Sequence, residues 1–478
     1  MKSPSTYDCA TPPDFRSWTV PSVPTTMTLP INQNPNQVKH IVIVGGGFAG
    51  LNCARKLAAD SNVRVTLLDK NNYQQFQPLL YQVATAILAS SNIAFNLRST
   101  FIGRSNVTVK MTEVVSIDLN TRTVQTAEGQ QYQGDFLVLA AGSQANFFGT
   151  PGADENSYPL YSLHDAERLR SRILAMLESA DRDPSLIVKG ALNFVIVGAG
   201  PTGTEMAGAF GDMLQSWLKK NVRERAYKTL AADRAQIFLI DGGPAVLRAF
   251  SPKSQTYAAK MLEERGVQFR PGTRVKEVGR GYVVLSDDTR IPTSTVIWAG
   301  GLKAASLSNK LGINTGRGGR IDVQADFTVP GLTGVYALGD FANIAGKDGE
   351  PLPQLASVAQ QAGKCCAKNI LLDIAGKPRE PFHYFDKGIM AMIGRNSGVA
   401  EVGEHRYGLH GVVAFGAWLG VHVALLSSMR AKIETIVEWA WDYLGGSGRG
   451  NAILDRTEEL QINWSGDGDG SAPKTLSK

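Results

Sequence analysis

The stretch His40-Ile41-Val42-Ile43-Val44-Gly45-Gly46-Gly47-Phe48-Ala49-Gly50 decides how this chain of 478 residues folds. Its first half is a short apolar run that ends in glycines, which is typical of a buried parallel strand. Its second half satisfies the pattern G-x-G-x-x-G: Gly45 permits a tight turn, Gly47 lets the backbone approach a pyrophosphate, and Gly50 lets the next helix pack closely. The helix N-terminus then faces the anion. The stretch predicts a strand, a phosphate-binding turn and a helix.

The residues that follow complete a nucleotide-binding βαβ unit. A helix is expected over 51–58 and a second strand over 64–69. Asp69 lies 24 residues after Gly45, at the end of that strand, where a carboxylate can bind ribose hydroxyls. The strand, the turn, the helix and the acid together are far more specific than the glycine pattern alone.

The same order recurs later in the chain. Residues 193–197 form an apolar strand, Gly198-Ala199-Gly200-Pro201-Thr202-Gly203 repeats the turn, and a further strand ends at Asp241. Asp241 comes 43 residues after Gly198, beyond the usual distance of about 20. A helical insertion over 212–233, rich in lysine and arginine, would account for the excess. Asp241 would repel the 2′-phosphate of NADPH and so favour NADH; the alternative is an ordinary strand-end aspartate in a turn.

Two such units predict an α/β fold with two Rossmann-like dinucleotide-binding domains, the second inserted in the first. The expected domains are 39–155 with 325–380, then 156–324, and a separate C-terminal region at 381–456. Residues 1–37 hold seven prolines, ten serines or threonines and four charged residues. They and residues 457–478 are expected to be disordered tails. The net charge of +6 permits weak attraction to an anionic membrane but is far short of a nucleic-acid-binding signature.

The four cysteines exclude some chemistry. Cys9, Cys53, Cys365 and Cys366 form no C-x-x-C pair, which argues for a reducing compartment without a disulfide framework or a zinc site, and no metal is expected. Cys53 falls on the first helix and Cys9 in the tail, so we predict no redox-active cysteine pair.

The C-terminal region is apolar. Residues 407–429 carry no charge, but Gly408, Gly411, Gly416 and Gly420, with His410 and His422, make a poor membrane-spanning helix. A buried or membrane-surface helix fits better. The next segment is amphipathic: Glu434, Glu438 and Asp442 form one stripe, and Ile433, Val437, Ala440, Trp441 and Leu444 form the opposite face. Three of the seven tryptophans lie in this region, and tryptophan favours membrane interfaces. The alternative is a helix that packs or dimerises.

The chain resembles the two-dinucleotide flavoproteins, in which the first turn binds FAD and the inserted turn binds NAD(P)H. The resemblance rests on 136–143, which look like the strand returning to the flavin domain, and on 333–340, which look like the late flavin motif that ends in Gly-Asp. An aspartate at such a strand end, here Asp340, can bind a ribityl hydroxyl.

More specifically, 39–456 is similar to the type II NADH dehydrogenases. The motifs are Asp69-Lys70-Asn71-Asn72-Tyr73, Phe76-Gln77-Pro78-Leu79-Leu80-Tyr81-Gln82-Val83-Ala84, Gly200-Pro201-Thr202-Gly203-Thr204-Glu205, Val296-Ile297-Trp298-Ala299-Gly300-Gly301, Phe382-His383-Tyr384, Asp386-Lys387-Gly388 and the Trp-Ala-Trp-Asp-Tyr run at 439–443. The resemblance implies FAD bound by Gly45, Gly47, Phe48, Ala49, Gly50, Asp69, Lys70, Gln77, Leu79, Gly142, Gly339 and Asp340. It implies NADH bound by Gly198, Gly200, Pro201, Thr202, Gly203, Glu205, Asp241 and Gly300.

The resemblance also implies a quinone site and catalytic residues. The family motif A-Q-x-A-x-Q corresponds to 356–361, where Ser357 replaces the first glutamine and Gln361 is retained. Ser357, Gln360 and Gln361 are the expected quinone contacts, and the Ser357 hydroxyl reaches less far toward a quinone carbonyl than a glutamine would. Glu205, Gln361 and Lys387 are the expected catalytic residues: Glu205 could deliver a proton to the quinone or bind the ribose or nicotinamide, and Lys387 is placed near the flavin or acceptor.

Together these features predict an FAD-dependent NADH:quinone oxidoreductase. Without membrane-spanning helices it would not pump protons. The quinone, ubiquinone or menaquinone, is not specified. The enzyme is expected as a homodimer and as a peripheral protein on the cytoplasmic face of a bacterial inner membrane, bound through 407–456. Two rival readings are a soluble NADH oxidase or carrier-protein reductase, and a flavoprotein that binds partners according to its redox state.

Overall fold

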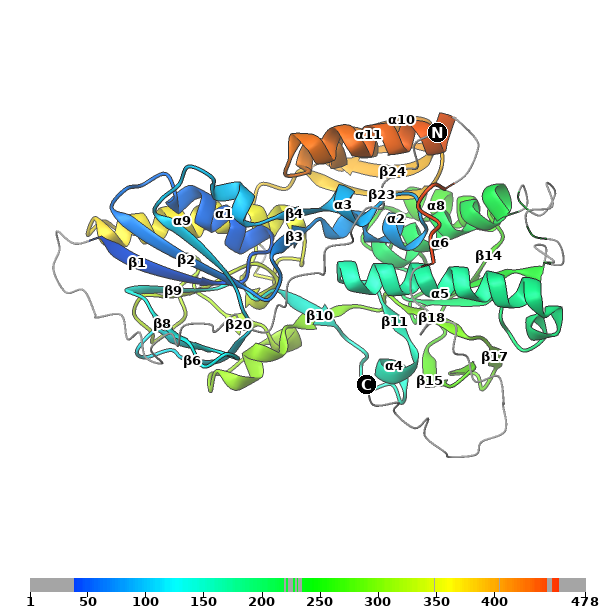
Figure 1. Ribbon diagram of the computed structural model, residues 1–478, viewed down its shortest axis with the longest axis horizontal. Helices are drawn as coiled ribbons and strands as arrows, with labels where there is room; N and C mark the ends of the chain where they lie inside the picture. Colours follow the sequence, from blue (N-terminus) through cyan, green and yellow to red (C-terminus); the bar gives the residue numbers. More distant parts are fainter. Residues whose placement is uncertain are drawn as a thin grey trace, which may run out of the picture.

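The computed structural model describes residues 38–218, 221, 227, 230, 234–347, 349–403, 405–444 and 449–454. Two five-stranded parallel sheets lie side by side along its long axis (Figure 1). The first sheet has the order β21-β9-β1-β2-β5 and the second β11-β18-β12-β13-β14. Their strands are β1 Lys39–Val44, β2 Val63–Asp69, β5 Val107–Met111, β9 Phe136–Leu139 and β21 Val335–Ala337, then β11 Tyr158–Pro159, β12 Asn193–Val197, β13 Gln236–Ile240, β14 Val267–Arg270 and β18 Thr295–Trp298.

The second sheet is inserted in the first, because all its strands lie in sequence between β9 and β21. The α/β class with two parallel nucleotide-type sheets is therefore confirmed. The predicted tails at 1–37 and 457–478 lie outside the residues that the structure describes.

Helices α1 (Phe48–Leu57) and α9 (Ala356–Ile374) cover one face of the first sheet, although some 300 residues separate them (Figure 1). A side-chain carbon on Gly363 of α9 would lie 2.2 Å from the carbonyl oxygen of Ala49. Glycine is therefore required for this close approach. The opposite face packs against the small sheet β6-β7-β8, so the first sheet is buried on both sides.

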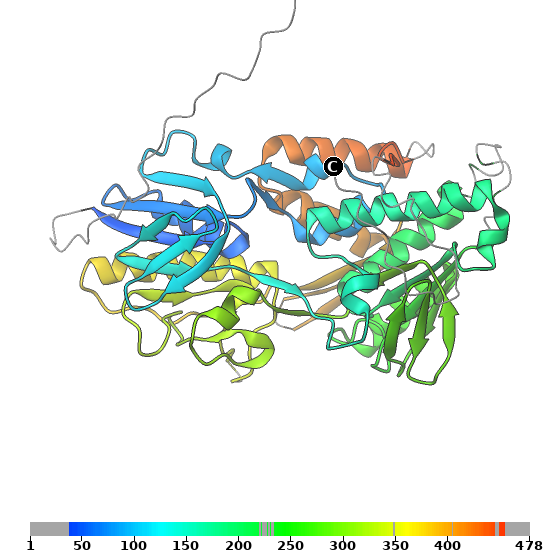
Figure 2. The same cartoon turned by 60° about the horizontal axis from the view of Figure 1, so that its bottom comes forward.

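Short elements complete the first unit and join it to the second. The antiparallel ribbon of β10 and β19 runs between the two units (Figure 2). These elements are β3 Tyr73–Gln75, η2 Gln77–Leu79, α2 Leu80–Ala84, α3 Ser90–Ile93, β4 Ala94–Asn96, η3 Arg98–Phe101, β6 Val114–Asp118, β7 Thr123–Thr126, β8 Gln131–Gln133, β10 Ser143–Ala145, β19 Leu302–Ala304, η7 Ser306–Lys310, η8 Arg317–Gly319, β20 Ile321–Asp322, η9 Gly339–Phe341 and β22 Ala342–Asn343.

The second unit repeats the layered arrangement. Its long helix α5 begins with a capping box in which Ser162 and Asp165 exchange hydrogen bonds with each other's backbone amides. Its further elements are α4 Ala153–Asn156, α5 Leu163–Arg182, η4 Pro184–Ile187, α6 Pro201–Asp212, α8 Pro252–Glu264, β15 Val275–Gly279, β16 Tyr282–Leu285 and β17 Arg290–Pro292. The expected insertion at 212–233 is described mainly at η5, a π-helical stretch over Met213–Leu218. Lys219, Lys220, Arg223, Arg225 and Lys228 lie outside the described residues.

The C-terminal region forms a three-stranded sheet, β23 Gly388–Gly394, β24 Ser397–Val402 and β25 Tyr407–His410, followed by α10 Gly411–Leu425 and α11 Met429–Leu444. The sequence prediction of one helical segment from residue 407 is wrong for its first four residues. They pair with β24 as an edge strand, and the backbone leaves the strand at Gly411, where φ is +70°. Among the described residues, no helix is both long and apolar enough to cross a membrane.

This region shares its hydrophobic core with the second unit. Met392, Trp418 and Trp439 belong to the same buried cluster as α5, α6 and the phosphate-turn residue Ala199. Trp418 is fully buried, and replacing such a side chain by alanine typically costs about 3–5 kcal/mol. The C-terminal helices are therefore fixed on the second unit rather than loosely attached.

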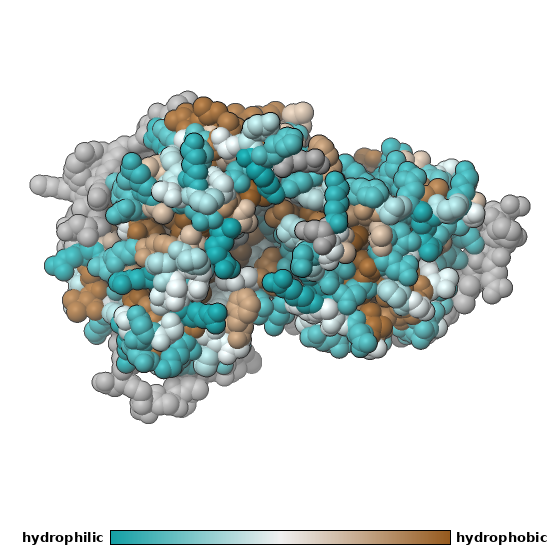
Figure 3. Space-filling view, turned by 180° about the vertical axis from the view of Figure 1, so that it is seen from behind, coloured by the Kyte–Doolittle hydropathy of each residue, from teal (hydrophilic) through white to brown (hydrophobic). Residues whose placement is uncertain are grey.

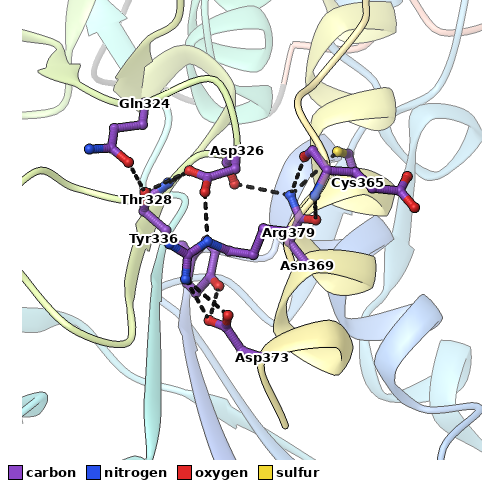
Figure 4. Close-up of polar contacts among 9 residues, drawn as sticks. Gln324, Asp326, Thr328, Tyr336, Cys365, Asn369, Asp373 and Arg379 are labelled. Atoms are coloured by element: carbon purple, nitrogen blue, oxygen red, sulfur yellow. Dashed lines mark hydrogen bonds and ion pairs between the residues drawn. The ribbon is translucent and has the colours of Figure 1, made fainter. Parts of the chain in front are cut away.

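A polar cluster anchors α9 at its far end (Figure 4). The Arg379 guanidinium pairs with Asp326 at 2.6 Å and with Asp373 at 2.9 Å, and the Tyr336 hydroxyl donates to Asp373 at 2.5 Å. Asn369 of α9 donates to the backbone carbonyls of Asp326 and Glu380. The cluster joins α9, β21 and the segment leading to the C-terminal region.

Candidate functional site

The two glycine turns have the same geometry. Gly45 and Gly198 have φ values of +104° and +101°, which favour glycine. A side-chain carbon on Gly50 would lie 1.9 Å from the carbonyl oxygen of Gly45, and one on Gly203 would lie 1.8 Å from that of Gly198. Both turns therefore require glycine at the first and last positions, as the sequence pattern predicts.

The acids at the two strand ends also match. Asp69 accepts hydrogen bonds from the backbone amides of Gly46 at 2.6 Å and Asn71 at 2.7 Å. Asp241 accepts from Ala199 at 2.7 Å and Gly243 at 2.6 Å. Burial raises the pKa of Asp69, and these amide hydrogen bonds oppose that effect. Asp241 thus occupies the place of Asp69 in spite of the longer sequence spacing, because the extra residues fall in sequence between α6 and β13.

Each turn leaves open space where a pyrophosphate could approach. Gly47 and Gly200 are the N-caps of α1 and α6, neither has a side-chain cap, and a side-chain carbon on either would meet no atom within 4 Å. The first amides of both helices face this space, which suits an anion. Gln77 adds a second sign of a missing partner, since its side-chain oxygen is buried without a hydrogen bond. These residues fit a bound dinucleotide.

The separate flavin motifs converge on the first turn. The Ser143 hydroxyl, next to Gly142, donates to Asp340 at 2.8 Å, and a side-chain carbon on Gly339 would lie 2.8 Å from the Ala49 side chain. Burial raises the pKa of Asp340. Segments 142–143 and 339–340 therefore meet beside Ala49. Of the other predicted FAD residues, Leu79 is buried two residues after Gln77, and Lys70 is exposed directly after Asp69.

At the second turn, Gly300 follows Ala299, whose carbonyl oxygen would lie 2.5 Å from a side-chain carbon on Gly198. Pro201 and Thr202 are exposed on the first turn of α6. The predicted NADH residues on this turn are therefore brought together. Glu205 lies about one helical turn further along α6, and its side chain contacts the C-terminal region.

Glu205 lies where three parts of the molecule meet. Its Oε1 accepts from the Met392 backbone amide of β23 at 3.1 Å and from the Trp418 indole of α10 at 3.2 Å. Tyr81 of α2, in the flavin-type signature, is buried near enough for the Glu205 charge to raise the Tyr81 pKa, although burial raises it more. Burial raises the pKa of Glu205 itself to about 8. Glu205 is therefore mostly protonated at neutral pH and can hold a proton.

We expect Glu205→Gln to change how stability depends on pH. Below its ordinary value of 4.5, the carboxyl is protonated in both the folded and the unfolded chain and contributes nothing. As pH rises towards about 8, only the unfolded chain has released the proton, so the wild type loses stability that the glutamine variant keeps. The variant should gain on the order of a few °C in Tm over the wild type between pH 5 and pH 9. Differential scanning calorimetry on both proteins measures this; a constant difference at all pH values would contradict the buried, raised pKa.

The predicted quinone residues of α9 are tied to the chain that follows. The Gln361 amide donates to the Phe385 carbonyl and accepts from the Phe385 amide, both at 3.0 Å. The Ser357 and Tyr384 hydroxyls are 2.9 Å apart, which gives the serine a local partner. Gln360 is partly exposed, and Lys387 is exposed just before β23. The structure thus brings Ser357 and Gln361 to the segment 384–385 and places Lys387 two residues beyond it.

Sequence reasoning missed the partners of Glu205. Trp418 stacks on His422 with ring centroids 3.7 Å apart, and burial lowers the pKa of His422 to about 4, so this imidazole is neutral. The sequence did contain a sign of the Trp418–His422 contact: the two residues are four apart in an apolar helix, and this spacing places them on one face. Nothing in the sequence showed that this face covers Glu205.

Two of the cysteines form a contact that the sequence did not predict. Cys53 of α1 and Cys366 of α9 are both buried, and their thiols are in hydrogen-bond contact. The sequence separates them by more than 300 residues and gave no sign of this pair. Both are free thiols, and burial raises the pKa of Cys366 well above its usual value. A thiol that does not ionise is a poor nucleophile, so the pair belongs to the helix contact.

The outer face of the C-terminal helices is apolar. Val413 of α10 and Ile433, Val437 and Trp441 of α11 are 56–67% exposed. Glu434, Glu438 and Asp442 are partly buried, so the apolar face, and not the acidic stripe, is outermost. Figure 3 shows hydrophobic residues gathered along this edge of the molecule. We refer to Val413, Ile433, Val437 and Trp441 as the apolar edge.

Comparisons with known proteins agree with this geometry. The sequence profile of the pyridine nucleotide-disulphide oxidoreductase family matches residues 39–363. The chain is 36% identical to the type II NADH:quinone oxidoreductase Ndh of Mycobacterium tuberculosis, over 86% of this chain and 89% of that protein, and 34% identical to NdhA of the same organism, over 85% and 87%. The fold resembles that of NDH2 from Plasmodium falciparum in complex with NADH, with a TM-score of 0.79, 19% identity and coverage of 86% of this chain and 100% of that chain.

Proposed function

The chain belongs to the pyridine nucleotide-disulphide oxidoreductase family and, within it, to the type II NADH:quinone oxidoreductases; from this membership we propose that it takes electrons from NADH through FAD to a membrane quinone without pumping protons. The observation that carries the proposal is the pair of matching turns, each with an open cradle and a strand-end acid in the same chain.

The first turn is the proposed FAD site. Gly45 to Gly50 and the N-terminus of α1 would hold the pyrophosphate, and Asp69 the ribose. Asp340 would bind a ribityl hydroxyl, and the buried side-chain oxygen of Gln77 would accept a hydrogen bond from the cofactor. When bound there, FAD supplies the ability to accept a hydride and pass two electrons to the acceptor.

The second turn is the proposed NADH site. The backbone amides at the start of α6 would bind the pyrophosphate, and Asp241 lies where the adenosine ribose would be expected. Gly198, Gly200 and Gly203 keep the backbone accessible at this point. The protein would thereby align NADH for transfer to the flavin.

Glu205 is the proposed proton donor to the quinone. Its Oε1 already accepts two hydrogen bonds, so the proton of the neutral acid belongs on Oε2. We place the quinone beside α9, near Ser357, Gln360 and Gln361, with Lys387 at its edge. In this arrangement Ser357 and Gln361 act through their hold on segment 384–385 as much as through contact with the quinone.

The apolar edge is the proposed membrane contact. Val413, Ile433, Val437 and Trp441 come from two helices and form one exposed face. Such a face is typical of a helix that lies in the membrane interface, and Trp441 suits that depth. The helices would thus bring the enzyme to its quinone without crossing the bilayer. A homodimer, and the cytoplasmic face of a bacterial inner membrane, stay predictions.

The test is NADH oxidation by the FAD-loaded protein in sealed liposomes that contain a long-chain quinone, with a water-soluble quinone as the parallel assay. We expect turnover with both quinones and no membrane potential. The variant Val413→Asp/Ile433→Asp/Val437→Asp should lose at least about tenfold in liposome binding, because each buried apolar side chain contributes about 1.5–3 kcal/mol. It should also lose turnover with the long-chain quinone and retain turnover with the soluble one.

The matched control is Val188→Asp, which changes an exposed valine on the second unit. It should leave both activities unchanged. If the triple variant keeps both liposome binding and long-chain quinone turnover, the apolar edge is not the membrane contact. If the wild type reduces its flavin rapidly with NADH but turns over neither quinone, the enzyme is a soluble oxidase or carrier-protein reductase instead.

A further inference from the structure

Two arginines lie across the loop that carries Asp241. A side-chain carbon built on Gly242 would come within 3.0 Å of both Cγ and Nε of Arg274. One built on Gly243 would lie 2.7 Å from Cδ and 2.9 Å from Nε of Arg248, and also 2.9 Å from Oδ1 of Asp241. Both arginines are exposed. The two glycines thus leave room for two guanidinium groups at the end of β13.

Both oxygens of the Asp241 carboxylate already accept a hydrogen bond. Oδ2 accepts from the Ala199 amide and Oδ1 from the Gly243 amide, so both carboxylate oxygens are held by the backbone of their own loop and of the glycine turn. Arg270 adds a third positive charge at the neighbouring strand end; the pKa of Asp287 is lowered mainly by hydrogen bonds from Thr289, and the charge of Arg270 lowers it further. If the charge of Arg270 is taken to cancel that of Asp287, the two positive charges of Arg248 and Arg274 exceed the single negative charge of Asp241.

The first unit has no such arrangement at the matching position. Asp69 is followed there by Lys70 and Asn71, where Asp241 is followed by Gly242 and Gly243. The arginine pair therefore distinguishes the second turn from the first. It stands where a nucleotide in a Rossmann-like unit carries its adenosine ribose.

We infer that Arg248 and Arg274 form a binding site for a phosphate on the 2′ position of the adenosine ribose, so that the enzyme accepts NADPH as a second reductant beside NADH. A guanidinium binds a phosphate with two parallel, charge-assisted hydrogen bonds, and an arginine at this end of the strand is the usual means of accepting a 2′-phosphate. The sequence predicts that Asp241 repels this phosphate; the two arginines beside it oppose that repulsion, and Asp241 retains its place for the ribose hydroxyls of NADH. The inference rests on the proposed function, since it assumes that the second turn binds the reductant.

The experiment is anaerobic rapid mixing of the full-length, FAD-loaded enzyme with NADH or NADPH, following the loss of flavin absorbance. We expect NADPH to reduce the flavin with a kcat/KM within about 100-fold of that for NADH. Arg248→Ala/Arg274→Ala should lower kcat/KM for NADPH by about 10- to 100-fold, the range for losing hydrogen bonds to a charged group. The value for NADH should change less than about threefold, which also shows that the variant is folded.

The control is Arg280→Ala, which removes an exposed arginine of the same unit at the turn between β15 and β16. It should affect NADPH and NADH equally. Equal losses for both reductants in the Arg248/Arg274 variant, or no measurable NADPH reaction in the wild type, would overturn the inference.

A binding measurement separates this inference from the proposed function. Isothermal titration of the same proteins with 2′,5′-ADP and 5′-AMP reports on the ribose phosphate without any electron transfer. The arginine variant should lose the preference for 2′,5′-ADP and keep its affinity for 5′-AMP. If NADH fails to reduce the flavin but this preference is present, the proposed function fails and the phosphate site stands. A wild type without the preference refutes the site.

Discussion

Replacing Gly47 by valine is expected to give a folded protein without flavin, whereas Gly200→Val should keep its flavin and lose the reaction with NADH. Both glycines have φ near −70°, which any residue adopts, and a side-chain carbon at either meets no atom within 4 Å. Valine therefore fits the empty cradle and blocks only the approach of a pyrophosphate. We expect flavin content below about a tenth of the wild-type value in the first variant, since a lost cradle contact of about 1.4 kcal/mol already costs tenfold.

Flavin content is measured by absorbance after gel filtration, and the NADH reaction by rapid mixing. Far-ultraviolet circular dichroism of both variants checks that each is folded. Because the two turns have the same geometry, each variant is the control for the other. If Gly200→Val loses the flavin and Gly47→Val keeps it, the two cofactor assignments are reversed; if both variants behave alike, the turns do not have separate roles.

Glu205→Gln is expected to slow the second half-reaction while leaving the first intact. Glutamine keeps the acceptor oxygen for the Met392 amide and the Trp418 indole, so the local contacts survive. It cannot release a proton, and a positioned general acid typically contributes 10²- to 10⁴-fold. We expect reduction by NADH to change less than about threefold and the return of flavin absorbance on adding quinone to slow by about 100-fold, at the lower end of that range.

The pH profile provides a signature that a purely structural role would not give. In the wild type, the quinone step should fall as pH rises through about 8, where Glu205 loses its proton. The glutamine variant should show no such fall. Glu264→Gln, an exposed glutamate at the end of α8, is the charge-matched control. A slowed NADH step with an unaffected quinone step would assign Glu205 to nicotinamide or ribose binding.

The position of Glu205 also explains why the C-terminal helices matter to the site. The inner face of α10 carries Trp418, which contacts Glu205, and its outer face carries the exposed Val413. The helix that contributes Val413 to the apolar edge therefore also helps to bury Glu205, and that burial raises the Glu205 pKa. A helix with both functions has little freedom in sequence, which agrees with its uncharged, glycine-containing composition.

Sequence alone determined the parts of this protein that depend on neighbours along the chain. The two glycine turns, the strands before them and the helices after them follow from local patterns, because a tight turn and a close helix contact admit few other residues. Asp69 and Asp241 were identified at their strand ends, and the structure places them alike. The amphipathic helix at Met429–Leu444 followed from its period of polar residues.

Only the tertiary structure decided what depends on contacts between distant segments. Trp418 meets Glu205 across 213 residues, Cys366 meets Cys53 across the α1–α9 contact, and Gln361 binds the backbone of Phe385. The arginines at Gly242 and Gly243 come from different loops of the second unit. A hydrophobic or charge pattern shows which residues will be buried or exposed, but not which partner each one finds, because the partner is set by how whole sheets and helices pack.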